Sequence, residues 1–392
     1  MMAGHDFVVF SDDWGRHPFS CQHVMRHFLP ANRLLWVNTI GLRLPRPSLY
    51  DVRRAAGKVA SWLAAPPSEP ELPGLRVISP VMIPFNPLPP VRAFNRHGVV
   101  RAVRAAMREW NMTAPILLAT VPNAADYLGH IGERLVVYYC VDDFSVWPGM
   151  NLPTMVRGME ERLVAEADLI LAVSRELQAT RQGRRGPTRL LTHGVDVEHF
   201  RQAAASQPRP AALADMAGPI IGFYGLIDTH LDLDIVRALV ERRSDWSVVL
   251  IGTARVDLGE LATRPNFRWL PAVPYADLPR YASAFDVAIV PYVLNWHTRT
   301  ANPLKFKEYL ATGKPVVSTP MAEVVEFSDL VLLARGPEEF TLAVERALRQ
   351  TVRLEDRLDR LAGQSWRDKA GLVSDWIGEA LGRTRPRAGE GA

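Results

Sequence analysis

The sequence lacks the features of a disulfide-stapled, zinc-stabilised or membrane-spanning protein. Only two of the 392 residues are cysteines, Cys21 and Cys140, and neither lies in a CxxC pair or another metal-ligand pattern. We therefore expect reduced thiols. No apolar run approaches the ~18 residues that a membrane-spanning helix requires, and no cationic leader precedes the first apolar stretch. These absences predict a cytoplasmic protein.

The chain also carries little net charge, but its positive charges are unevenly placed. The net charge is +4, yet residues 26–108 hold thirteen Lys and Arg against three acids. Such a segment meets an anionic partner or forms a solvated arginine-rich face. Nucleic acid is not the partner that we expect, because no recognised nucleic-acid-binding module accompanies the segment.

What the sequence does contain is the pattern of a two-domain α/β protein. Hydrophobic residues make up 48% of the chain, and short aliphatic runs alternate with helix-length amphipathic segments. This alternation predicts parallel sheets covered by helices on both faces. Strands are expected at 6–11, 33–38, 75–80, 115–120, 134–141, 168–174 and 188–195, and then at 219–225, 246–252, 266–272, 286–292, 315–320 and 330–335.

The two series of strands predict two Rossmann-like, doubly wound domains facing a cleft. Ligands of such sheets bind beyond the carboxyl ends of the strands, so we expect the functional residues there. The expected division is an N-terminal domain at 1–200, a linker at 201–218, a C-terminal domain at 219–365 and a helix at 366–382 that packs back on the first domain.

Four segments resemble GT-B glycosyltransferases of group 1, which use nucleotide sugars. The longest is Pro303–Pro320 (PLKFKEYLATGKPVVSTP), and it resembles the donor-binding segment of that family. His193-Gly-Val-Asp196 with Phe200, Ile221–Gly225 and residues 266–278 resemble further landmarks in the family's order. Residues 138–149 resemble the corresponding part of xanthan glucuronosyltransferases, which have an aspartate there.

The resemblance implies a donor site in the second domain. Its residues would be Gly225, Asp228, Val273, Tyr275, Tyr292, Arg299, Asn302, Pro303, Leu304, Lys305 and Glu308. A helix beginning near Pro303 would offer free N–H groups to a diphosphate. Lys305 would neutralise a phosphate charge, and by the role that the residue at its position has in the family, Glu308 would bind the ribose hydroxyls. Alternatively, Lys305 and Glu308 form an exposed i,i+3 pair.

The chain departs from the family at two places. Group-1 enzymes usually have two glutamates separated by seven residues, but Thr300 stands eight positions before Glu308. The loop after Gly225 also lacks the Arg and Lys with which many relatives hold the pyrophosphate. The resemblance implies retention of configuration, but the missing carboxylate leaves the stereochemistry open. Lys305 becomes the principal candidate for the phosphate cation.

Asp142 and Asp143 are the catalytic candidates, because both follow a strand that the sequence predicts to be buried. A carboxylate near a like charge and aromatic rings gains proton affinity, which suits a general base. We expect Asp142 to be the base. Alternatively, Asp142 caps the loop and Asp143 is solvated. Acceptor-side candidates are Asp13, Trp14, Gln22 and His193.

A metal or cofactor is not expected. Asp232-Leu-Asp234 matches the DxD metal motif of another glycosyltransferase class, but it opens an amphipathic helix, where acids complement the dipole. No GxxxxGK[ST] or GxGxxG pattern occurs. The sequence therefore predicts a metal-independent glycosyltransferase that acts on a lipid-linked or saccharide acceptor. The inner leaflet of a membrane is a candidate place for this reaction. The alternatives are a sugar-nucleotide epimerase of the same fold and a non-catalytic nucleotide-sugar-binding scaffold.

Overall fold

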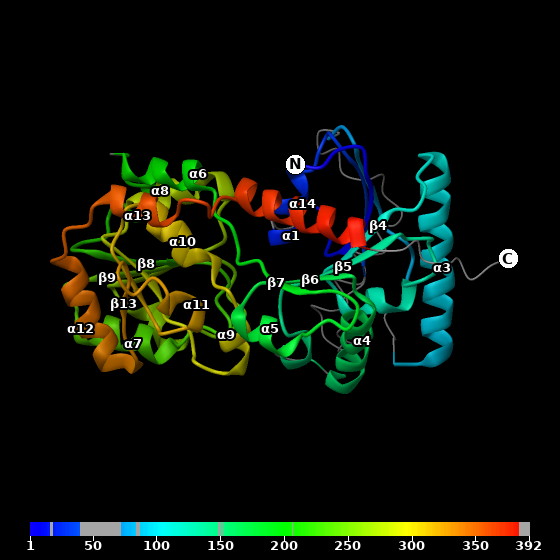
Figure 1. Cartoon of the computed structure of the whole chain (residues 1–392). Coiled ribbons are helices and arrows are strands. Elements are labelled where there is room, and N and C mark those ends of the chain that lie inside the picture. Colours follow the sequence, from blue (N-terminus) through cyan, green and yellow to red (C-terminus); the bar gives the residue numbers. More distant parts are fainter. Residues whose placement is uncertain are drawn as a thin grey trace. The chain divides into compact units, whose positions relative to one another are not determined.

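The computed structural model describes residues 1–15, 19–39, 72–83, 87–147, 150, 152–205 and 207–383 (Figure 1). The chain divides into two compact units. The first comprises Met1–Thr192 and the chain from Trp366 onward, and the second comprises His193–Ser365. Within the described ranges, no helix combines the length and apolar character that crossing a bilayer requires.

The first unit is built on a parallel sheet of seven strands in the order β3-β2-β1-β4-β5-β6-β7. Its strands are β1 Asp6–Ser11, β2 Arg33–Asn38, β3 Leu75–Ile78, β4 Ile116–Ala119, β5 Leu135–Cys140, β6 Leu169–Ala172 and β7 Thr188–Leu190. Val8 of β1 pairs with Leu35 of β2 and Leu117 of β4. These central strands are buried, as continuous aliphatic runs predict for a sheet covered on both faces.

Helices cover this sheet. They are α1 Ser20–Arg26, α3 Pro89–Glu109, α4 Pro153–Glu166, α5 Arg175–Thr180 and α14 Trp366–Arg383, with 3-10 turns η1 Pro122–Tyr127 and η2 Phe144–Val146. The last helix, α14, lies beside α1 in this unit (Figure 1). The rings of His23 and Trp366 stack with centroids 4.6 Å apart, so the C-terminal helix completes the core of the N-terminal unit.

The second unit has a parallel sheet of six strands in the order β10-β9-β8-β11-β12-β13. They are β8 Ile220–Tyr224, β9 Ser247–Ile251, β10 Phe267–Leu270, β11 Val287–Val290, β12 Val316–Ser318 and β13 Leu332–Leu333. The helices are α6 Val197–Arg201, α7 Leu233–Arg242, α8 Leu278–Ser283, α9 Trp296–Thr300, α10 Leu304–Ala311, α11 Ala322–Val325, α12 Gly336–Leu348 and α13 Leu354–Arg360. Two apolar clusters pack in this unit.

Each of the thirteen strands named above overlaps a strand expected from the sequence. Residues 201–218, expected as a linker, instead lie within the second unit. Their turns η3 Gln202–Ala204 and η4 Ala211–Leu213 bury Ala203 and Leu213 in its core. The reason is that a Pro-rich and Ala-rich composition does not reveal the few apolar side chains that anchor such a segment.

Candidate functional site

The loops that follow β8 and β11 carry most of the expected donor residues. The two strands are parallel neighbours in the sheet, so their carboxyl ends meet at one edge. Gly225 directly follows β8, and Tyr292 lies two residues beyond β11. An isolated bridge pairs Leu231 with Tyr292, and the Val293 N–H donates to the His230 carbonyl at 2.8 Å. Main-chain pairing therefore holds the two loops together.

Gly225 is required because the Lys305 side chain lies against it. Its φ of +144° favours glycine, and a Cβ at this position would overlap Lys305 Cε. Gly252, which follows the neighbouring strand β9, is required for a similar reason, since a Cβ there would overlap the Gly225 carbonyl. The glycine loop and the first turn of α10 are thus packed at van der Waals distance.

Lys305 is a cation held in place by its surroundings. Its Nζ donates to the Tyr292 hydroxyl at 3.1 Å and lies 5.8 Å from the ring centroids of Phe223 and Tyr292. Burial alone would lower the pKa of Lys305, but Tyr292, Glu308 and Asp228 together raise it above the usual value. The ammonium therefore stays charged at neutral pH, beside the N-terminus of α10 that begins after Pro303.

Glu308 is buried, with 4% of the residue exposed, so the alternative of an exposed i,i+3 pair with Lys305 is wrong. Burial raises the pKa of Glu308 to about 7, although Lys305 and Tyr224 act to lower it. The Tyr309 hydroxyl accepts a hydrogen bond from the Tyr224 N–H at 2.8 Å. A carboxylate poised to ionise near neutral pH, among aromatic residues and next to a lysine, can accept hydrogen bonds from vicinal hydroxyls.

Asp228 does not offer a free carboxylate. Its Oδ1 lies 2.9 Å from the His230 N–H and 2.7 Å from His230 Nδ1. Burial would raise the pKa of Asp228, but the hydrogen bonds from His230 lower it. The ring of His230 lies against that of His297, with centroids 4.2 Å apart. Asp228 therefore orients a histidine in the loop that follows β8.

Tyr275 and Val273 follow β10 and pack against the apolar cluster of the second unit that contains Phe200 and Tyr224. Tyr275 stacks on His199 at 4.7 Å and meets Phe200 edge-on at 5.6 Å. Burial, with Glu308 and Asp196, raises the pKa of Tyr275. Val273 is half-buried against the same cluster.

The segment between β11 and α10 explains what replaced the missing glutamate. Asn295 caps α9 through a reciprocal pair of hydrogen bonds with Thr298. Thr300 is fully buried, and its hydroxyl lies 2.9 Å from the His297 carbonyl, where it closes the turn instead of facing a ligand. Arg299 is exposed, and its guanidinium lies over the Trp296 ring at 5.2 Å. Asn302 and Pro303 are buried and Leu304 is half-buried.

Lys307 is a residue that the sequence did not single out. It is 2% exposed, and its Nζ donates to the His193 carbonyl at 2.6 Å and to Gln364 Oε1 at 3.0 Å. The lysine thereby fixes the main chain at His193, which the sequence placed on the acceptor side and which the structure places in the second unit.

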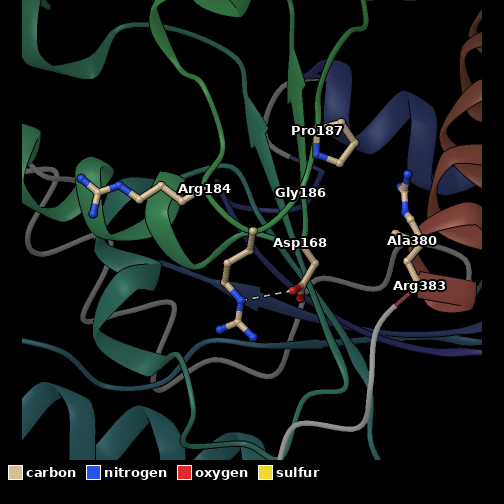
Figure 2. A pocket seen from close by; sticks show the side chains of 7 residues that line it. Asp168, Arg184, Gly186, Pro187, Ala380 and Arg383 are labelled. Carbon is tan, nitrogen blue, oxygen red and sulfur yellow. Dashed lines mark ion pairs between the residues drawn. The ribbon is translucent and has the colours of Figure 1, made fainter.

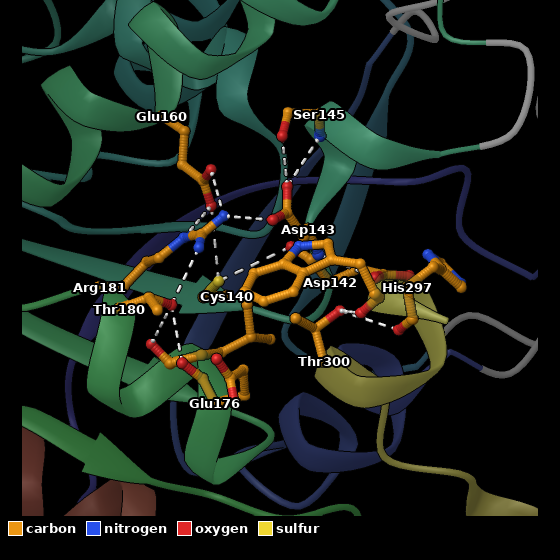
Figure 3. Close-up of polar contacts among 12 residues, drawn as sticks. Cys140, Asp142, Asp143, Ser145, Glu160, Glu176, Thr180, Arg181, His297 and Thr300 are labelled. Carbon is orange, nitrogen blue, oxygen red and sulfur yellow. Dashed lines mark hydrogen bonds and ion pairs between the residues drawn. The ribbon is translucent and has the colours of Figure 1, made fainter. Parts of the chain in front are cut away.

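In the first unit, Asp142 and Asp143 follow β5, whose six residues are all buried (Figure 3). Asp142 is half-buried and accepts from the Asp143 N–H and from Trp147 Nε1, both at 2.8 Å. Asp143 is 3% exposed, and its Oδ1 accepts from the Ser145 N–H at 3.1 Å and the Ser145 hydroxyl at 2.6 Å. The alternative that Asp143 is solvated is therefore wrong.

Arg181 joins Asp143 to α4. Its Nη2 lies 2.9 Å from Asp143 Oδ2 and 3.1 Å from Glu160 Oε2 (Figure 3). The Tyr138 hydroxyl donates to Glu160 Oε1 at 2.8 Å, and the Cys140 thiol lies 3.6 Å from the same oxygen. Because this network occupies Asp143, Asp142 is the carboxylate of the pair that retains an exposed surface.

Asp13, Trp14 and Gln22 lie at the carboxyl end of β1. Gln22 is buried, donates to the Asp13 carbonyl at 3.1 Å and accepts the Gly15 N–H at 3.3 Å. The amide thus supports the loop. Trp14 packs edge-on to Trp36 at 4.7 Å, and Arg26 lies over its ring at 5.3 Å. Asp13 is half-buried.

The acids of the DxD match begin a helix. Asp232 caps α7 by accepting from the N–H groups of Asp234 and Ile235, and Asp234 pairs with Arg237 at 2.5 Å. Among the residues that the structure describes, no group of three or more His, Cys, Asp or Glu side chains is placed to hold a metal ion.

Two surface hollows lie at the amino ends of strands, away from the carboxyl ends that carry the expected site residues. One of about 360 Å³ is lined by Asp168, Arg184, Arg185, Gly186, Pro187, Ala380 and Arg383. Figure 2 shows Arg184 and Arg383 on either side of Asp168. Asp168 and Pro187 precede β6 and β7, so this hollow lies at amino ends of strands, as does a second one beside Pro219 and Pro315. Neither is where a parallel sheet places its ligand.

Sequence reasoning missed Arg181, Glu160, Trp147, Tyr224 and His230. Arg181 and Glu160 lie far from Asp143 along the chain, and no local pattern signals their pairing. Tyr224 had a signal, because it ends the strand that precedes Gly225.

Comparison with protein families and curated proteins gives two matches. Residues 219–350 match the family model described as "Glycosyl transferases group 1". The chain is also similar to a protein named as the teichuronic acid biosynthesis glycosyltransferase TuaH of Bacillus subtilis (strain 168). The identity is 27% over 208 residues, which are 50% of this chain and 52% of that protein. The chain thus spans about half the length of this curated relative.

Several solved structures share the fold over nearly the whole chain. Anabaena HepE, solved in complex with UDP-glucose, has a TM-score of 0.65 at 15% identity and covers 96% of this chain and 100% of its own. Sucrose-phosphate synthase from Thermosynechococcus elongatus has a TM-score of 0.68 at 14% identity, with 97% and 100% covered. Trehalose 6-phosphate synthase from Burkholderia multivorans has a TM-score of 0.65 at 14% identity, with 98% and 100% covered. The predicted GT-B fold class is confirmed.

Proposed function

We propose that this chain, whose residues 219–350 match the group 1 glycosyltransferase model, transfers a sugar from a nucleoside diphosphate sugar to an acceptor hydroxyl. One observation carries the proposal. Lys305 lies against Gly225 in the first turn of α10, and Glu308 is buried in the same helix. Lys305 and the helix N-terminus would bind the diphosphate of the donor. The Glu308 carboxylate would accept hydrogen bonds from two vicinal ribose hydroxyls.

In this proposal the nucleotide leaves with charge stabilisation from the protein. Negative charge develops on the β-phosphate as its bond to the anomeric carbon breaks, and Lys305 with the N–H groups of α10 stabilises it. Asp142 takes the proton of the attacking acceptor hydroxyl. Neither role requires a metal or a cofactor. Thr300 supplies no carboxylate to the donor sugar, so the stereochemical outcome is left open.

We also propose a lipid-linked or saccharide acceptor reached at an anionic surface. The relative TuaH is named for teichuronic acid biosynthesis, which suggests a saccharide. Helix α3 presents an exposed stripe with spacings of three and four residues, formed by Phe94, His97, Arg101, Arg104 and Arg108. A basic stripe that ends in an exposed phenylalanine suits an anionic bilayer surface. The part of the basic segment at residues 40–71 lies outside the described residues.

The epimerase alternative has no support from the family match, which is to transferases. The binding-only alternative retains one supporting observation, the replacement of the first family glutamate by buried Thr300. Turnover distinguishes these alternatives. A transferase releases nucleotide only with an acceptor, apart from slow hydrolysis, whereas an epimerase converts the sugar nucleotide alone and a scaffold does neither.

The test begins with thermal-shift measurements on the full chain with UDP-, GDP-, ADP- and TDP-glucose. A bound ligand at 100 times its dissociation constant stabilises the folded state by about 2.7 kcal/mol. We expect one nucleotide class to stabilise the wild type and to have a much smaller effect on Lys305→Ala. No stabilisation by any nucleotide sugar in a well-folded wild type would contradict the proposal.

A further inference from the structure

We propose that Trp147 forms, together with Asp142, the subsite that binds the acceptor sugar. The exposed surface of the indole would receive the apolar C–H face of a pyranose ring, and the neighbouring carboxylate would face the hydroxyl that attacks. This inference rests on the proposed function for its chemistry, but it concerns saccharide binding in the first unit, which is measured separately.

The first supporting observation is the exposure of an anchored aromatic ring. Trp147 is 42% exposed, although a tryptophan gains by burial. Its Nε1 donates to Asp142 Oδ2 at 2.8 Å, and its ring lies 5.0 Å from that of Phe144. One edge of the indole is therefore fixed, so binding a sugar on the remaining surface costs little side-chain entropy.

The second observation is that the loop beneath Trp147 is pinned by a buried network. Asp143 caps η2 and pairs with Arg181, whose side chain is 14% exposed and also contacts Glu160. These contacts join the loop to β5 through Tyr138, to α4 and to α5. A binding platform must be rigid, because a sugar stacked on a mobile loop would not be held close to the carboxylate that takes its proton.

Other exposed tryptophans in the described ranges are engaged differently. Trp269 donates its Nε1 proton to the Gly252 carbonyl, and the face of Trp296 lies under the Arg299 guanidinium. Only a carboxylate partner, as at Trp147, places a proton acceptor beside the ring. An indole face is electron-rich and attracts the weakly positive C–H groups of a sugar, whereas a carboxylate accepts from its hydroxyls.

The chemical step balances with these groups alone. The acceptor oxygen forms a bond to the anomeric carbon while the bond from that carbon to the β-phosphate oxygen breaks. The electron pair of the broken bond leaves with the nucleoside diphosphate. The hydroxyl proton passes to the Asp142 carboxylate, which also accepts hydrogen bonds from the Asp143 N–H and from Trp147 Nε1.

The experiment measures sugar binding before turnover. Saturation-transfer NMR of octyl glucoside, galactoside and glucuronide is recorded with the full-length wild type, Trp147→Ala, Trp147→Phe and a control, Trp110→Ala, on the first unit at the end of α3. We expect at least one glycoside to bind the wild type, Trp147→Ala to weaken it about tenfold, and Trp147→Phe and the control to bind within about threefold. Unaltered binding by Trp147→Ala, or no glycoside binding by the wild type, would overturn the proposal.

Kinetics separate the platform from the proposed function. With a bound glycoside as acceptor, Trp147→Ala should raise KM while donor affinity and slow donor hydrolysis stay at wild-type values. Trp147→Phe should keep KM near the wild-type value, because it retains an aromatic ring. An equal loss of donor hydrolysis in Trp147→Ala would contradict a platform role. Failure of nucleotide sugars to bind the wild type would instead refute the proposed function.

Discussion

Replacing Glu308 with glutamine should stabilise the protein at alkaline pH while weakening its affinity for the donor. Burial raises the pKa of Glu308 from 4.5 to about 7. The folded state therefore holds a proton that the unfolded state releases as the pH rises from 4.5 to 7, and stability falls across that window. Above pH 7 the full cost of a buried carboxylate is present, and the difference between the two pKa values corresponds to roughly 3 kcal/mol.

Glutamine is nearly isosteric and carries no charge, so Glu308→Gln avoids this cost. We expect urea unfolding of the full chain at pH 8 to show the variant more stable by about 2–3 kcal/mol, with the difference shrinking toward zero near pH 4.5. Glu198→Gln is the matched control, because Glu198 is exposed and pairs with Arg201 across one turn. Its effect should stay within about 0.5 kcal/mol at both pH values.

The same variant should lose donor affinity, because glutamine replaces an acceptor-only group with one that also donates. The loss expected for a charged hydrogen bond is about 1.5–3 kcal/mol, measured by titration calorimetry with the nucleotide that stabilises the wild type. In the wild type, donor affinity should rise with pH through about 7 as Glu308 ionises. A variant that is no more stable than the wild type at pH 8 would show that burying the ionised Glu308 carboxylate costs no folding free energy, and the prediction would be wrong.

Four further predictions concern the donor cation, metals, the paired aspartates and the basic helix. Lys305→Ala should weaken donor binding by about 1.5–3 kcal/mol in calorimetry, and unchanged affinity would remove its phosphate role. Activity should survive excess EDTA; loss that Mg²⁺ or Mn²⁺ restores would indicate metal-assisted departure. Asp142→Asn should lower kcat by about 10²–10⁴ in a folded protein, whereas Asp143→Asn should chiefly lower stability, since it breaks a buried pair. Anionic liposomes should sediment the protein at low salt and release it at high salt, and Arg101→Glu should reduce this, unless neutral vesicles bind equally.

The strands and the donor helix could be predicted because their signals are local. Aliphatic runs marked each of the thirteen strands, and the Pro303 to Glu308 motif marked the start of α10. The burial of Glu308 could not be read from spacing, since an i,i+3 pair looks the same on an exposed face. Its environment comes from Tyr224 and Tyr275, which arrive from other strands and loops of the unit.

The adjacent aspartates show how tertiary contacts divide roles that a sequence leaves equal. Nothing local distinguishes Asp142 from Asp143 at the end of β5. The difference arises because Arg181 at the end of α5 forms an ion pair with Asp143, and because Asp143 also accepts hydrogen bonds from Ser145 and caps η2. Asp143 is engaged in holding the loop, whereas Asp142 is half-buried and accepts a hydrogen bond from the Trp147 indole. A buried pair therefore fixes the main chain from which the adjacent carboxylate projects, which is what the proposed role of Asp142 as a base requires.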